Sequence, residues 1–141
     1  MRTFGTSITI HAAPDVVWRL LTDASGYPAW NRTVDRVEGR ILPGRKITVH
    51  VKAAPGRAFP VTVATFEAPS RMVWHGGMPF GLFAGTRTFE VRSTGANTVE
   101  FSMREAYTGL LAPLITRSIP DLQPAFDEFS ACLKARAEGS N

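Results

Sequence analysis

The sequence LLAPLITRSIPDLQPAFDEFSACLKARA, residues 110–137, determines what the rest of the chain has to supply. Apolar or small side chains recur in it every three or four residues, which is the spacing of one face of a helix. These residues are Leu111, Leu114, Ile115, Ser118, Ile119, Leu122, Ala125, Phe126, Phe129, Cys132 and Leu133. Charged side chains on the opposite face predict an amphipathic helix rather than a membrane span. A helix with so wide an apolar face needs a large apolar partner.

Two prolines, Pro120 and Pro124, interrupt this stretch. A proline inside a helix removes a backbone donor and crowds the preceding turn. We therefore expect either a kink in one long helix or a short helix followed by a longer one.

The residues upstream of the helix predict a sheet, because their apolar positions alternate with a period of two. Seven segments are predicted strands on this basis: 4–11, 34–39, 46–53, 60–66, 71–75, 83–92 and 98–107. Their short, proline- and glycine-rich connections favour antiparallel pairs, since a parallel pair needs a crossover. Between the first two strands, Pro14 and Asp15 begin one short helix, and residues 24–30 form a second. The prediction is an α+β fold in which a seven-stranded antiparallel sheet curves around the C-terminal helix.

Composition indicates one globular domain covering residues 1–141, since 141 residues suffice for one core and not for two. The start of the chain lacks the apolar core of a secretion signal, and the single cysteine, Cys132, excludes an intrachain disulfide. Both observations favour a cytoplasmic location. The net charge is +4, but the basic residues are scattered, which does not favour nucleic-acid binding. The sequence holds no metal-ligand spacing, nucleophile elbow, phosphate loop or dinucleotide fingerprint, so we expect no cofactor and no metal.

Several short motifs make the whole chain resemble one superfamily. They are ITI (8–10), APDVVW (13–18), LTD (21–23), YPAWN (27–31), PSR (69–71) before Trp74, then Phe89, the strand at 98–105 and Gly109. In this order they resemble the polyketide cyclase/dehydrase, START-like (SRPBCC) superfamily. The resemblance implies a helix-grip fold with a ligand cavity between sheet and helix. Members bind lipids, steroids, polyketides, quinones or plant metabolites, and some are cyclases or dehydratases.

Strand parity puts two charged residues, Arg87 and Glu105, on the face that should meet the helix. If the turn at 93–97 is tight, Arg87 lies opposite Met103 and Glu105 is its diagonal neighbour. A charge on a buried face must be paired, solvated or functional. Either the two residues satisfy each other at a wet end of the sheet, or they line a cavity and one of them orients a polar ligand group. The nearby Arg87 does not favour Glu105 as a general base.

Aromatic and apolar residues share that face, and they can form either a filled core or the wall of a pocket. Tyr107 is the best polar handle among them, because a buried phenol needs a partner. The candidate ligand-binding residues are Trp74, His75, Arg87, Phe89, Phe101, Met103, Glu105, Tyr107, Leu122, Phe126 and Phe129. The glycine-rich, apolar segment 76–83 is either a mobile entrance loop whose Met78, Phe80 and Leu82 contact a ligand, membrane or partner, or an ordinary turn that packs them down.

The sequence therefore predicts a protein that binds a small, largely apolar molecule, such as a lipid, polyketide or aromatic metabolite. Two alternatives stay open. One is an enzyme of the polyketide cyclase/dehydratase kind, in which Arg87, Tyr107 or Glu105 positions and protonates the substrate. The other is an interaction module similar to the heat-shock-ATPase activators. In each case we expect a monomer or homodimer without stable membrane insertion.

Overall fold

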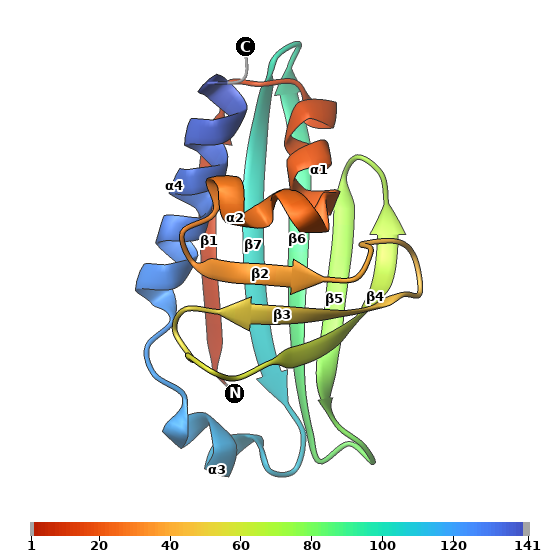
Figure 1. Cartoon of the computed structure of the whole chain (residues 1–141), viewed down its shortest axis with the longest axis vertical. Helices are drawn as coiled ribbons and strands as arrows, with labels where there is room; N and C mark the ends of the chain where they lie inside the picture. The colour runs from red at the N-terminus through yellow and green to blue at the C-terminus, as the bar shows by residue number, and fades with distance from the viewer. Residues whose placement is uncertain (1, 140–141) are drawn as a thin grey trace.

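Seven antiparallel strands form one curled sheet in the computed structural model, which describes residues 2–139 (Figure 1). The strand order is β1-β7-β6-β5-β4-β3-β2. The strands are β1 Thr3–Ile10, β2 Val34–Glu38, β3 Lys46–Val51, β4 Phe59–Glu67, β5 Arg71–Met78, β6 Phe83–Gly95 and β7 Thr98–Thr108. The helices are α1 Pro14–Thr22, α2 Tyr27–Trp30, α3 Ala112–Ile115 and α4 Gln123–Gly139, with short 3-10 helices at Ala24–Gly26 and Thr116–Ser118. This confirms the predicted helix-grip α+β fold; residues 1 and 141, the predicted domain limits, lie outside the described residues.

The C-terminal segment adopts the second of the two predicted forms, a short helix followed by a longer one. α3 and the 3-10 helix after it end before Pro120, and α4 begins with Pro124 at its second position. A proline there costs no hydrogen bond, because the first N–H groups of a helix have no partner within it. α4 runs along β1 in Figure 1 and buries its apolar face against the sheet. That face consists of Phe126, Phe129, Cys132, Leu133 and Ala137. Within residues 2–139, no helix has the length and apolar character needed to cross a bilayer.

The two short helices after β1 form as predicted and are tied to each other. α1 has proline at its start and buries Val17, Trp18 and Leu21. The hydroxyl of Tyr27, from α2, is fully buried and donates a 2.7 Å hydrogen bond to the carbonyl of Leu21. This bond satisfies the phenol inside the core and fixes the angle between the helices.

The register between β6 and β7 differs from the prediction, which was wrong by two residues. β6 continues to Gly95 rather than ending at Arg92, so the turn is shorter and Ser93 pairs with Val99. A bulge between Ser93 and Gly95 accommodates the extra residue. As a consequence, Arg87 lies directly opposite Glu105 instead of opposite Met103.

Aromatic rings fill the core between the sheet, α2 and α4. Phe129 of α4 is at the centre, with its ring centroid between 5.6 and 6.3 Å from four other aromatic rings. Those four residues are Tyr27, Trp30, Phe89 and Phe101. Trp74 joins the group through an edge contact with Phe89. This half of the interior is a packed core.

The start of β1 is connected to the segment that precedes α4. One guanidinium nitrogen of Arg2, Nη1, donates to the carbonyls of Thr116 at 2.8 Å and Ile119 at 2.6 Å. The Arg2 guanidinium also lies over the ring of Phe4, 4.9 Å from its centroid. The segment between α3 and α4 is therefore held against the end of the sheet.

Candidate ligand-binding site

A row of side chains crosses three neighbouring strands on the face that meets α4. Trp74 of β5 pairs with Arg87 of β6, and Arg87 pairs with Glu105 of β7. Paired residues of antiparallel strands point to the same face, so all three share the inner face of the sheet. The alternation in β6 and β7 predicts this placement for the two charged residues. It does not predict that they are direct neighbours.

Arg87, Glu105 and Tyr107 form one hydrogen-bonded network. Arg87 Nε donates to Glu105 Oε1 at 2.8 Å, and the hydroxyl of Tyr107 donates to Glu105 Oε2. The side chains of Arg87 and Glu105 keep only 16% and 15% of their surface exposed. We call these three residues the polar cluster. Its charges are paired, as a charge on a largely buried face must be.

Aromatic rings surround the polar cluster. The guanidinium of Arg87 lies over the ring of Phe126, 4.8 Å from the centroid, which is a cation–π contact. Phe83 stacks on Tyr107 with centroids 5.8 Å apart, and Phe4 meets the edge of the same ring. The guanidinium is thus held by a carboxylate on one edge and by an aromatic face.

Burial and charge together keep the Tyr107 phenol protonated. Removal from water raises the pKa of Tyr107, and the neighbouring Glu105 carboxylate raises it further, while Arg87 and Arg2 oppose this more weakly. A protonated Tyr107 is a hydrogen-bond donor, and it donates to Glu105. Both oxygens of Glu105 therefore accept a hydrogen bond from the protein.

The arrangement leaves donors free on Arg87. Among the described residues, its guanidinium donates through Nε to Glu105, so Nη1 and Nη2 can donate to another acceptor. An arginine edge of this kind suits a carbonyl, carboxylate or phenolate oxygen. The chemistry of the cluster is that of a fixed, positively charged donor set in apolar surroundings.

Some of the partly exposed apolar side chains that pack against the core lie toward the end of the sheet that holds the polar cluster. These residues are Val61, Phe83, Ile119 and Leu122. They come from β4, from β6 and from the segment before α4. We call this end the mouth.

The predicted site residues fall into two groups and one exception. Trp74, Phe89, Phe101, Met103 and Phe129 are buried in the packed core, whereas Arg87, Glu105, Tyr107, Phe126 and Leu122 lie at or beside the polar cluster. His75 is the exception, because it lies on the face of the sheet opposite the polar cluster. Its exposed side chain shares the outer face with Thr86, whose Oγ1 is 3.0 Å from His75 Nδ1.

Sequence reasoning left two residues out of the candidate site, Phe4 and Phe83. Both contact the ring of Tyr107. Strand alternation already puts Phe4 and Phe83 on the inner face, which is the signal that identifies them. By contrast, nothing in the sequence indicates that the buried atoms Trp30 Nε1, Asn31 Nδ2 and Trp74 Nε1 have no hydrogen-bond partner within residues 2–139.

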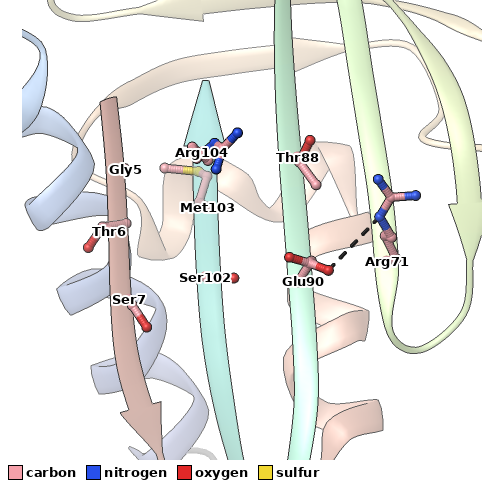
Figure 2. A pocket seen from close by; sticks show the side chains of 9 residues that line it. All are labelled: Gly5, Thr6, Ser7, Arg71, Thr88, Glu90, Ser102, Met103 and Arg104. Carbon is pink, nitrogen blue, oxygen red and sulfur yellow. Dashed lines mark ion pairs between the residues drawn. The ribbon is translucent and has the colours of Figure 1, made fainter. Parts of the chain in front are cut away.

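A groove of about 590 Å³ lies on the opposite, outer face of the sheet (Figure 2). Figure 2 shows its lining residues on β1, β5, β6 and β7, with Arg71 of β5 paired to Glu90 of the neighbouring β6 at 4.0 Å. It is open and polar, and it is separate from the polar cluster. Among residues 2–139, no group of three or more His, Cys, Asp or Glu is arranged to hold a metal ion.

Solved structures show the same fold at low sequence identity. A hypothetical protein of Helicobacter pylori is 15% identical, with a TM-score of 0.78 over 96% of this chain and 88% of its own. A START superfamily protein of Mycobacterium smegmatis is 12% identical, with a TM-score of 0.72 over 99% of both chains. The ZhuI aromatase/cyclase of Streptomyces sp. R1128 is 15% identical, with a TM-score of 0.72 over 97% of this chain and 93% of its own. These identities establish likeness of fold.

Sequence comparison assigns the chain to a family. No curated protein matches the sequence. The family described as "Polyketide cyclase / dehydrase and lipid transport" matches residues 1–138, nearly the whole chain. The seven-stranded curled sheet, the long C-terminal helix and this match agree with one another. The chain belongs to the polyketide cyclase/dehydrase and lipid transport family.

Proposed function

We propose that the protein binds a small, largely apolar ligand at the mouth, with a hydrogen-bond-accepting group of the ligand on Arg87. One observation carries this proposal: a guanidinium fixed by Glu105 and Phe126 on the inner face keeps two nitrogens free. If Arg87 only neutralised Glu105, it would need neither uncommitted N–H donors nor contact with an aromatic ring. The family, whose description joins cyclases with lipid transport, supports the same class of ligand.

The shape of the ligand follows from what surrounds Arg87. Phe83, Leu122 and Phe126 offer apolar contact, while the guanidinium offers charge and donors. An apolar body with one acidic or carbonyl end matches both. The packed aromatic core around Phe129 leaves the mouth, rather than the full length of the interior, as the place for the ligand.

The geometry supports binding more than proton-transfer catalysis. A general base needs an oxygen within hydrogen-bond reach of the substrate proton. Both oxygens of Glu105 already accept protein hydrogen bonds, one of them from Tyr107. For the same reason the Tyr107 proton is not directed at a substrate. A cyclase would have to rearrange this cluster when its substrate binds.

The proposal is tested with the fluorescent fatty acid parinarate and its methyl ester. They share an apolar body, but only the acid carries a carboxylate. Arg87→Met should weaken binding of the acid by roughly 10- to 100-fold, as expected for loss of a charge-assisted hydrogen bond, and affect the ester much less. Arg104→Met is the matched control, because Arg104 neighbours Glu105 in β7 but is exposed on the outer face.

Equal affinity of wild type and Arg87→Met for the acid would overturn the proposal. Native mass spectrometry of protein purified from its own host complements the titration. A co-purifying molecule that is lost from Arg87→Met and retained by Arg104→Met would identify the natural ligand. Turnover of that molecule, abolished in a Glu105→Gln variant that still binds it, would establish the enzyme instead.

A further inference from the structure

The end of the molecule beyond the mouth exposes large apolar side chains. They come from the turn between β5 and β6 and from the segment around α3, which lie at the same end in Figure 1. The exposed fractions are 93% for Phe80, 82% for Leu110, 64% for Leu114 and 49% for Met78. We call these four residues the apolar tip.

Hydrogen bonds hold the two segments of the apolar tip together. The amide of Leu110 donates to the carbonyl of Gly81 at 3.2 Å, and the amide of Leu111 donates to the carbonyl of Leu82 at 2.8 Å. The backbone segments that carry the exposed side chains are therefore adjacent at this end of the molecule. Scattered apolar residues on a surface are ordinary, but a contiguous group marks an interaction site.

The backbone at Phe80 strengthens this interpretation. Phe80 and Gly81 have φ values of +62° and +67°, and the Leu82 amide closes the turn onto the Pro79 carbonyl at 3.3 Å. Two successive positive φ values define a tight hairpin turn that favours asparagine or glycine. A phenylalanine there is strained and gains no burial in the fold. Such a residue points to a role outside the folded chain.

The charge near the apolar tip favours an anionic partner over a cationic one. The segments 76–83 and 108–120 contain no acidic residue, and Arg117 is their one charged side chain. The whole chain carries a net charge of +4. Protruding apolar side chains with an adjacent basic residue are suited to the interface of an anionic bilayer, where the apolar groups enter the acyl boundary and the arginine meets the headgroups.

We infer that the apolar tip docks reversibly on anionic lipid membranes. The side chains of Phe80, Leu110, Leu114 and Met78 enter the interface, and Arg117 adds electrostatic attraction. Docking is peripheral, which agrees with the lack of a spanning helix among residues 2–139. Since the tip adjoins the mouth, docking brings the ligand site next to the lipid surface.

Vesicle cosedimentation tests this inference with the full chain. Vesicles of equal parts phosphatidylcholine and phosphatidylglycerol should bind the protein more tightly than vesicles of phosphatidylcholine alone, and salt should reduce the difference. Phe80→Ser combined with Leu110→Ser should weaken binding by at least tenfold, because each substitution removes one inserted apolar side chain. Arg117→Gln should weaken binding to the anionic vesicles by about fivefold. Leu42→Ser, which changes a partly exposed leucine between β2 and β3, is the matched control and should bind as wild type does.

A substitution that relieves the backbone separates docking from folding. Phe80→Asn suits the positive φ, so it should leave the melting temperature unchanged or raise it while vesicle binding falls. Phe80→Trp supplies a direct reporter, because the three native tryptophans are buried. Its emission should shift to the blue on anionic vesicles and be quenched by lipids with brominated acyl chains.

Three results would overturn the inference. The first is that the protein binds neither kind of vesicle, and the second is that emission from the Phe80→Trp variant stays unquenched on vesicles that bind it. The third is that the tip instead joins two copies of the chain, seen as a dimer that Phe80→Ser dissociates. Failure of membrane docking can be distinguished from failure of the proposed ligand site. Arg87→Met should keep vesicle binding, and Phe80→Asn should keep the affinity for parinarate.

Discussion

Removing both charges of the polar cluster should destabilise the protein by less than the sum of the two single removals. At 2.8 Å the attraction between Arg87 and Glu105 is about 6 kcal/mol in a medium with an effective dielectric constant of about 20, and desolvation cancels most of it. Arg87→Met removes a charge-assisted hydrogen bond worth about 1.5–3 kcal/mol and the contact with Phe126, worth about 0.5–1 kcal/mol. Packing by the methionine offsets part of this loss. We expect the free energy of unfolding to fall by about 2–3 kcal/mol.

The double variant Arg87→Met/Glu105→Met distinguishes a buried pair from a solvated one. In a shielded pair, each single substitution leaves the other charge without its partner. The double variant should therefore lose about 1–2 kcal/mol less free energy of unfolding than the two single variants lose together. Urea denaturation followed by far-UV circular dichroism measures these values. Arg71→Met/Glu90→Met is a control, because these residues form an exposed ion pair at 4.0 Å between β5 and β6 on the outer face. If Arg87→Met stays within about 0.5 kcal/mol of wild type, as surface substitutions do, the cluster is solvated and our reasoning about it is wrong.

Two further predictions concern the core. Phe129→Ala should lower the free energy of unfolding by about 3–5 kcal/mol, because it opens a cavity at the centre of the aromatic group. Chemical denaturation measures the loss. Phe129→Leu should lower the free energy of unfolding by less, because leucine fills part of that cavity. Alkaline pH should destabilise the fold, because burial raises the pKa of both Tyr27 and Tyr107 above the unfolded value of about 10. Their contribution is complete below about pH 10 and is lost as the pH rises, so urea midpoints measured from about pH 8 to pH 11 should fall, with a shallower slope in Tyr107→Phe. An equal slope in wild type and Tyr107→Phe would contradict this assignment for Tyr107.

The fold could be predicted from the sequence because two periodicities dominate it. Alternation with a period of two locates the strands, and the spacing around Phe126 and Phe129 locates the apolar face of α4. Alternation also assigns Arg87 and Glu105 to the inner face. The parity of a strand is preserved when its register shifts by two residues, so it could not reveal that the two residues are directly opposed.

Other features of the site depend on contacts that no local pattern encodes. His75 is close in sequence to Trp74, but successive residues of a strand point to opposite faces, so it lies on the outside. Whether the aromatic residues fill a core or line a pocket depends on how closely α4 approaches the sheet. Phe80 is exposed in a turn with two successive positive φ values. The glycines of segment 76–83 predict a turn, but they do not predict its conformation.

The order in which the strands are synthesised has a consequence for folding during translation. β1 is made first, yet its sheet partner is β7 and the helix that covers it is α4, both about 100 residues later in the chain. During translation β1 therefore has neither neighbour, and its apolar residues Phe4, Ile8 and Ile10 stay available to other nascent chains or chaperones until β7 and α4 have emerged. The native sheet requires β1 to pair with β7, so a chain that terminates before β7 lacks the strand that β1 pairs with.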